Sequence, residues 1–277
     1  MSGVKLAFDK IACQGTKKFD LLICHGLLGN RLNFRSLSKR PEMSGVADLY
    51  LVDLRNHGQS PHVDSMKPAD FSADLVRFCD DHGIDRPVLF GHSMGGKACI
   101  KTALDYPDRV RGLIIGDVGP YDYTKFQGVE TSNLDILKYL YALDFNIFKT
   151  KDLVRVELMK FTNNKKTMVE FFLTNLEEDT STGKLKWRIN LPVLTKDYFN
   201  YSSYTPSASD KYFGPTKLIY GTKSEYAPVE RLPEFKKYFP LFDTEKDAFA
   251  IPAGHWIHFA EPELFLAHFK TALASIA

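Results

Sequence analysis

A serine with the surroundings of a nucleophile lies in the pentapeptide Gly91-His92-Ser93-Met94-Gly95. A Gly-x-Ser-x-Gly pattern holds a reactive hydroxyl on a sharp turn between a strand and a helix. Residues 87–90 are an apolar run typical of a strand, and the residues from Met94 onward are compatible with a helix. The two glycines leave room for strand and helix to pass closely. We therefore predict that Ser93 is the nucleophile of an acyl-transfer reaction.

Backbone amides that could stabilise an oxyanion are predicted in a second turn. The apolar run 21–24 leads into His25-Gly26-Leu27-Leu28-Gly29, a glycine-spaced turn after a strand. The N–H groups of Leu27 and Met94 are the predicted oxyanion pair, and loss of one such donor costs about 10²- to 10³-fold in rate. The alternative is that the glycines only shape a turn. We expect His25 to hold this loop and not to act as a base.

A general base is expected on the loop that follows the last predicted strand. His255 comes after Ile251-Pro252-Ala253-Gly254, where sheet-based sites collect their ligands. His258 is the alternative base on the same loop. The flexible backbone at Gly254 favours His255.

Two carboxylates compete to orient the base. In this class of site the acid follows the penultimate strand, here residues 218–221, but the expected position holds Ser224, and Glu225 is adjacent. Asp117 stands at the end of the apolar run 110–116 and could reach the distal nitrogen of His255 from the neighbouring strand. We favour Asp117; its alternative role is a helix cap.

The elements that position these residues alternate along the chain. Short apolar runs bounded by turn residues alternate with segments of helical period, a pattern that predicts an α/β fold with a mostly parallel sheet flanked by helices. The predicted strands are residues 19–24, 49–54, 87–90, 110–116, 216–220 and 247–251, and the clearest helices are residues 71–82 and the segment from Pro262 onward.

The middle of the chain has a different pattern. Helical periods at residues 134–143, 153–161 and 168–176 are followed by a polar turn at 177–184. We predict a core formed by residues 1–119 and 214–277 and an inserted helical lid, residues 120–213. Aromatic residues of the lid are expected to line an apolar pocket for an acyl chain.

The composition limits the partners and the compartment. A hydrophobic fraction of 44% is ordinary for a globular protein, and a net charge of +2 without long runs of one sign argues against nucleic acid. The sequence contains no uninterrupted apolar window of about 18 residues, so it predicts no membrane-spanning helix. Four cysteines without paired spacing favour free thiols over disulfides or zinc. We expect a cytoplasmic protein without metal or organic cofactor; the sequence does not predict its oligomeric state.

Taken together, several motifs resemble one family. They are the His25 to Gly29 loop, Asp53-Leu54-Arg55-Asn56-His57-Gly58, the Ser93 pentapeptide, Trp187-Arg188-Ile189-Asn190 and Gly254-His255-Trp256-Ile257-His258. This set is similar to the α/β-hydrolase domain-containing protein 11 group, the bacterial YbfF-type esterases and the yeast ethanol acetyltransferases. The resemblance implies Ser93 as nucleophile, Asp117 as acid, His255 as base and the Leu27 and Met94 amides as the oxyanion pair. It also implies a small polar residue at position 224 and a possible mitochondrial location.

The residues and the resemblance together predict a serine esterase or thioesterase. Its substrate is expected to be a small-molecule ester or thioester with a short to medium acyl chain. An alcohol acyltransferase with the same residues and a non-catalytic ligand-binding protein of the same fold are the alternatives. Residues 130–178 do not match the family, so the resemblance transfers no substrate preference.

Overall fold

A computed structural model describes residues 3–126 and 129–276. Within these residues seven strands form one sheet in the order β1-β3-β2-β4-β5-β8-β9. The strand β1 pairs antiparallel with β3, and the remaining pairs are parallel. The bounds are β1 Phe8–Ile11, β2 Phe19–Cys24, β3 Ala47–Val52, β4 Val88–His92, β5 Gly112–Gly116, β8 Thr216–Gly221 and β9 Ala248–Ile251. The predicted fold class is confirmed.

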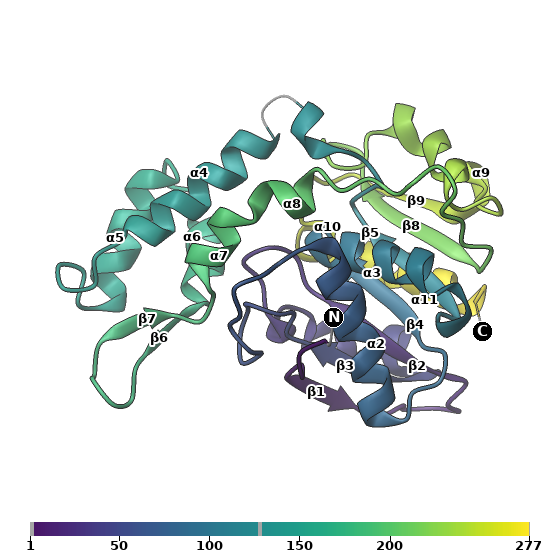
Figure 1. Cartoon of the computed structure of the whole chain (residues 1–277), viewed down its shortest axis with the longest axis horizontal. Helices are drawn as coiled ribbons and strands as arrows, with labels where there is room; N and C mark the ends of the chain where they lie inside the picture. The colour runs from purple at the N-terminus through teal and green to yellow at the C-terminus, as the bar shows by residue number, and fades with distance from the viewer. Residues whose placement is uncertain (1–2, 127–128, 277) are drawn as a thin grey trace.

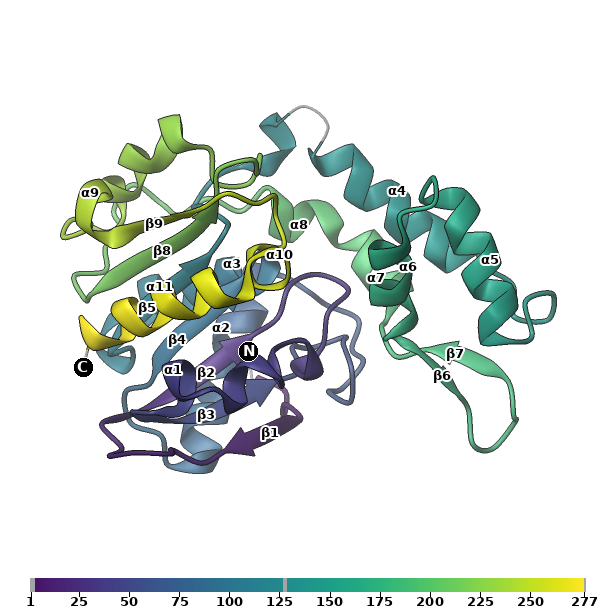
Figure 2. The ribbon, with the colours of Figure 1, turned by 180° about the vertical axis from the view of Figure 1, so that it is seen from behind.

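Helices cover both faces of the sheet (Figures 1 and 2). One face carries α2 (Pro68–His82) and α3 (Met94–Asp105), and the other carries α1 (Pro41–Ser44) and α11 (Pro262–Ala274). Smaller helices are α9 Thr244–Asp247, α10 Ile257–Ala260 and the 3₁₀ turns η1 Arg31–Phe34, η2 Leu37–Lys39, η3 Pro107–Arg109, η4 Tyr123–Lys125 and η5 Val229–Lys237. Central strands such as β4 are buried along their whole length because helices lie on both sides, which explains their continuous apolar runs.

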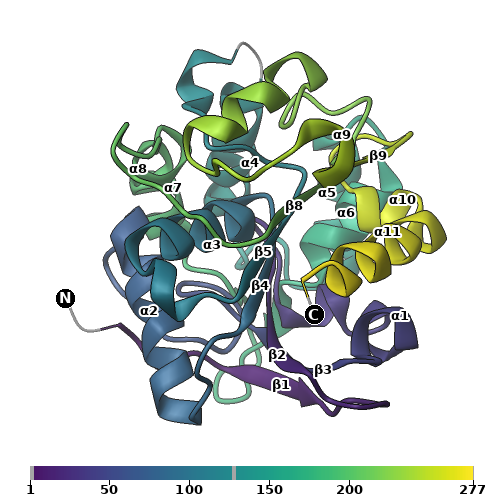
Figure 3. The same ribbon diagram turned by 90° about the vertical axis from the view of Figure 1, so that its right-hand side faces the viewer.

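Between β5 and β8 the chain lies outside the seven-stranded sheet. We call residues 120–213 the inserted segment. It extends from one end of the sheet (Figures 1 and 2) and lies behind the core in the end-on view of Figure 3. Its elements are α4 Val129–Ala142, α5 Lys151–Phe161, α6 Lys166–Leu173, β6 Leu176–Glu178, β7 Leu185–Trp187, α7 Leu191–Lys196 and α8 Tyr198–Ser202. The strands β6 and β7 form an antiparallel hairpin.

Several predicted boundaries were wrong. The predicted strand 49–54 lies two residues earlier, because Asp53 and Leu54 belong to the loop after β3. The predicted helix 168–176 ends at Leu173, and Leu176 begins the β6–β7 hairpin, which was predicted as a polar turn. The edge strand β1 was not predicted, because it has four residues and is nowhere buried.

All four cysteines have free thiols, as the sequence predicts. Cys24, Cys79 and Cys99 are buried, and Cys13 is partly exposed. Burial raises the pKa of the Cys79 thiol to about 12, so that this side chain is a small apolar group at neutral pH. Among the described helices, none has the length and apolar character needed to cross a bilayer.

Candidate active site

Ser93 occupies the turn between β4, which ends at His92, and α3, which begins at Met94. Its backbone angles are φ 55° and ψ −121°, outside the regions that a residue with a side chain prefers. Such a conformation costs about 1–3 kcal/mol and persists where the surroundings impose it. The Ser93 N–H donates to the carbonyl of Gly116 at 2.9 Å, which fixes the turn against the end of β5.

The glycines on either side of Ser93 are required by close backbone contacts. A Cβ atom on Gly91 would lie 2.2 Å from the carbonyl oxygen of Gly95, and one on Gly95 would lie 2.5 Å from the carbonyl oxygens of Cys24 and His25. A side chain at either position would force β2, β4 and α3 apart. The spacing of the pentapeptide is therefore a packing requirement.

His255 lies beside Ser93, with 2.8 Å between Nε2 and the Ser93 Oγ. The ring of Tyr226 stacks on the imidazole at a centroid distance of 3.8 Å and an angle of 20°. The Nε2 of His92 lies 2.8 Å from the His255 carbonyl and helps to hold the loop. The alternative base, His258, packs its ring on Phe34 at 4.5 Å. The structure thus brings His255, and not His258, into hydrogen-bond contact with Ser93.

Asp117 follows β5 and is fully buried, with a left-handed φ of 48°. Its Oδ2 lies 2.7 Å from the Nδ1 of His255. The same oxygen accepts a hydrogen bond from the Ser224 hydroxyl at 2.5 Å, and Oδ1 accepts one from the Gly221 N–H at 2.8 Å. Glu225, the alternative acid, is exposed. Sequence reasoning noted the small side chain at position 224 but missed its contact with the carboxylate.

The predicted oxyanion loop is a turn closed by a hydrogen bond from the Gly29 N–H to the Gly26 carbonyl at 3.0 Å. It passes next to the nucleophile, because a Cβ on Gly26 would lie 3.3 Å from the Cβ of Ser93. Within residues 3–126 and 129–276, the amides of Leu27 and Met94 are paired with no acceptor. Met94 is also the first residue of α3, where the helix dipole favours negative charge.

His25 and its neighbours hold this loop. The His25 Nε2 accepts a hydrogen bond from the Leu54 N–H at 3.0 Å, and Nδ1 lies 2.8 Å from the Gly26 carbonyl. Burial lowers the pKa of His25, and burial lowers that of His57 to about 3, so both rings are neutral at physiological pH. His25 therefore has the structural role that the sequence predicts.

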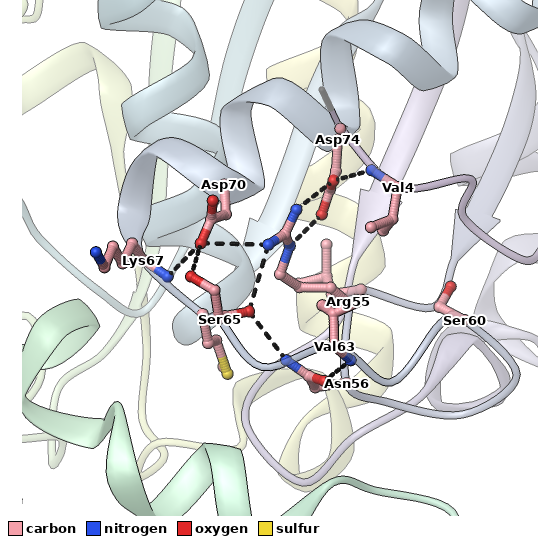
Figure 4. A network of polar contacts seen from close by, with 12 residues as sticks. Val4, Arg55, Asn56, Ser60, Val63, Ser65, Lys67, Asp70 and Asp74 are labelled. Atoms are coloured by element: carbon pink, nitrogen blue, oxygen red, sulfur yellow. Dashed lines mark hydrogen bonds and ion pairs between the residues drawn. The ribbon is translucent and has the colours of Figure 1, made fainter. Parts of the chain in front are cut away.

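Arg55 organises the next loop through buried ion pairs (Figure 4). Its guanidinium donates to both carboxylate oxygens of Asp74, at 2.5 and 2.6 Å, and lies 3.2 Å from Asp70. The Asn56 side chain accepts from the Val63 N–H at 2.8 Å. These contacts hold the Asp53 to Gly58 motif in one conformation beside the site.

Two features of the surroundings bear on ligands. A cavity of about 640 Å³ opens beside Ser224, lined by Phe126, Lys223, Glu225 and Arg231 among others, but Ser93 and His255 do not line it. Its mixed charges do not match the predicted apolar acyl pocket. Across the described residues, no three His, Cys, Asp or Glu side chains are placed to share a metal ion.

Comparison with known proteins shows the family to which the chain belongs. A profile described as the alpha/beta hydrolase fold matches residues 21–262. A Danio rerio protein named sn-1-specific diacylglycerol lipase ABHD11 is 30% identical, over 98% of this chain and 83% of its own. A Saccharomyces cerevisiae protein named probable alcohol acetyltransferase is 27% identical, over 91% of this chain and 76% of its own.

A solved structure described as a marine microorganism esterase superposes with a TM-score of 0.86 and 28% identity, covering 96% of this chain and 98% of that one. These relatives confirm the resemblance found in the sequence motifs. The chain therefore belongs to the α/β hydrolase fold family and is a serine hydrolase of that family.

Proposed function

We propose that the protein hydrolyses carboxylic esters or thioesters by a two-step acyl transfer through Ser93. The observation that carries the proposal is a continuous chain of hydrogen bonds from the Ser93 Oγ to His255 at 2.8 Å and from His255 to Asp117 at 2.7 Å. A serine hydroxyl, an imidazole and a buried carboxylate in this order are the parts that activate a nucleophile at neutral pH.

In the first step the Ser93 Oγ attacks the ester carbonyl carbon while the His255 Nε2 accepts the hydroxyl proton. The carbonyl oxygen becomes an oxyanion and accepts hydrogen bonds from the Leu27 and Met94 amides. The intermediate then collapses, the bond to the leaving oxygen or sulfur breaks, and the leaving group takes the proton from Nε2. Ser93 now carries the acyl group.

In the second step water replaces the leaving group beside His255. The imidazole accepts a proton from the water, whose oxygen attacks the acyl carbon. Collapse of the second oxyanion releases the carboxylic acid and returns the proton to the Ser93 oxygen. Asp117 stays ionised and stabilises the positive charge on the imidazolium in both steps. The sequence of steps needs no metal or organic cofactor.

We further propose that the inserted segment is a lid that selects the acyl group. Its elements carry many of the aromatic side chains of the chain, including the partly buried Phe145, Phe171 and Trp187. Short to medium acyl chains are the proposed substrates. The relative named a diacylglycerol lipase supports a carboxylic ester as the substrate class.

Rapid-mixing kinetics with p-nitrophenyl butyrate test the proposal. The expected result is a burst of p-nitrophenol equal to the enzyme concentration, and labelling of the protein by a fluorophosphonate. Both are lost in Ser93→Ala and retained in Ser72→Ala, a buried serine that instead bonds Ala69 and Asp105. If the native protein gives no burst and is not labelled, a non-catalytic ligand-binding protein is favoured.

An alcohol acyltransferase is the second candidate, because a relative bears that name. The acyl-enzyme would be the same, and an alcohol would replace water as the acceptor. Hydrolysis of p-nitrophenyl acetate in increasing ethanol separates the two. Ethyl acetate that forms in excess of acetate at millimolar ethanol identifies a transferase, whereas acetate as the main product identifies a hydrolase.

A further inference from the structure

A buried asparagine of the inserted segment reaches the predicted oxyanion loop. Asn175 lies between α6 and β6 and is fully buried. Its Nδ2 donates to the carbonyl oxygen of Leu28 at 2.5 Å, and its Oδ1 lies 3.4 Å from the Nδ2 of Asn30. These two side-chain contacts are therefore with the loop that carries the Leu27 amide and with the residue that directly follows it.

The backbone of Asn175 is itself held in place. Its N–H donates to the Phe172 carbonyl at 3.0 Å, and its carbonyl accepts from the Arg188 N–H at 2.8 Å. The first bond ties it to the last turn of α6, and the second ties it to the residue that follows β7. A side chain fixed in this way presents its amide in one direction, which is what a positioning residue requires.

The oxyanion loop needs such a contact, because its own sequence does not favour its conformation. Leu28 has a φ of 59°, in the left-handed region that glycine adopts readily and that is sterically strained for a residue with a side chain. In the turn from Gly26 to Gly29, Leu28 is the third residue, and a positive φ there normally calls for glycine or asparagine. The side chain of Leu28 is nevertheless buried in the hydrophobic core, which explains why this position holds leucine in place of glycine.

We propose that Asn175 is a positioning residue for the oxyanion loop, supplied by the inserted segment. By holding the Leu28 carbonyl it fixes the turn whose other central residue is Leu27, and so sets the direction of the Leu27 N–H toward Ser93. The inference rests on the proposed acyl-transfer function, in which that amide stabilises the oxyanion. Asn175 touches no reacting atom in this scheme.

The test compares Asn175→Leu, which keeps the approximate shape and removes the donor, with Asn190→Leu. Asn190 is a matched control because its side-chain amide also links the inserted segment to a loop of the core, bonding the Asn56 Oδ1 at 3.0 Å. The kcat is measured per active site titrated with a fluorophosphonate, so that misfolded protein does not count. The KM for p-nitrophenyl butyrate and the Ki of a trifluoromethyl ketone, which forms a tetrahedral adduct, are measured beside it.

We expect Asn175→Leu to lower kcat about 10- to 100-fold, because a shift of about 1 Å in one oxyanion donor has this effect. KM should stay within about twofold, and the Ki of the ketone should rise in proportion to the loss in kcat. Asn190→Leu should lower Tm without changing kcat per titrated site. If Asn175 had only a structural role, Asn175→Leu would lower Tm and the number of titratable sites but would leave kcat per site and Ki unchanged.

A double-mutant cycle with Leu28→Gly gives a second measurement. Glycine adopts the positive φ without strain, so the loss caused by Asn175→Leu should shrink to less than about threefold in the Leu28→Gly background. Asn175→Ala, which removes the same donor and leaves space for water, replaces Asn175→Leu where the latter yields no titratable sites. The proposal is overturned if Asn175→Leu and Asn175→Ala both keep the native kcat per site. It is also overturned if replacement of Asn175 lowers kcat equally in the native and the Leu28→Gly backgrounds. Absence of both a burst and fluorophosphonate labelling in the native protein instead overturns the acyl-transfer function.

Discussion

Replacement of Asp117 by asparagine tests the proposed orientation of the base. The Oδ1 of Asp117 accepts the Gly221 N–H at 2.8 Å, so an amide at this position must keep its oxygen on that side. Its NH₂ group then replaces Oδ2 and faces the His255 Nδ1 at about the present 2.7 Å. Since an NH₂ group only donates, Nδ1 must accept, and the imidazole proton moves to Nε2.

The size of the expected loss follows from this tautomer. With a proton on Nε2, the imidazole donates to the Ser93 Oγ and cannot accept its proton, so the nucleophile is not activated. We expect kcat to fall about 10⁴-fold, which corresponds to about 5.4 kcal/mol of transition-state free energy. Loss of one charged hydrogen bond alone, with the tautomer unchanged, would cost only about 1.5–3 kcal/mol, or roughly 10- to 150-fold.

The assay is steady-state hydrolysis of p-nitrophenyl butyrate with sites counted by slow fluorophosphonate labelling. Glu225→Gln is the control, because this exposed carboxylate is adjacent to Ser224 and is the alternative acid. We expect Glu225→Gln to keep kcat within about twofold. A loss of less than tenfold in Asp117→Asn, together with a large loss in Glu225→Gln, would refute the assignment of the acid to Asp117.

Three further changes have outcomes that follow from the contacts. Ser224→Ala removes the hydroxyl that donates to the Asp117 Oδ2 and should lower kcat roughly tenfold with KM unchanged, as measured by the same steady-state assay. Arg55→Met leaves the buried Asp74 carboxylate without its ion pair and should lower the free energy of unfolding by about 3–5 kcal/mol in urea titrations. His57 is neutral in the folded protein, with a pKa of about 3, while the unfolded chain binds a proton below its usual value of 6.5. His57 alone should therefore lower the free energy of unfolding by about 2 kcal/mol between pH 7 and pH 5, and His57→Gln should make the total loss smaller by about this amount in urea titrations at the two pH values.

The sequence predicted the parts of the fold in which local pattern and burial agree. Strand β4 is buried on both faces, so its apolar run and the pentapeptide after it identify the strand and its turn without further information. The position of Asp117 followed from the same logic, because it comes directly after the buried strand β5. Which of the two carboxylates contacts His255 depends on the order of strands in the sheet, and a single sequence does not contain that order.

The inserted segment was harder to predict, because its local pattern and its tertiary contacts disagree. Apolar residues in 168–176 recur at helical spacing, and the sequence therefore predicts a helix through residue 176. These residues are Met168, Val169, Phe172, Leu173 and Leu176. In the structure the helix stops at Leu173, and Leu176 instead pairs with Trp187 in the hairpin. The pairing of β6 with β7 and the burial of Asn175 override the helical period. Neither can be recognised from the sequence of residues 168–176 alone.

Three side chains of the inserted segment contact loops around Ser93, and these contacts predict how the segment affects kcat. Asn133 of α4 donates to the Tyr226 hydroxyl at 2.6 Å, and the Tyr226 ring stacks on the proposed base. Phe171 of α6 packs against Trp256, the residue after that base, at 5.7 Å. Asn175 donates to the Leu28 carbonyl, in the proposed oxyanion loop. Because these three contacts end on three different loops around Ser93, substitutions of Asn133, Phe171 or Asn175 should change kcat as well as the choice of acyl group. An insertion that served only to select substrates would change KM between substrates and leave the rate of acyl transfer with the smallest ester unaffected.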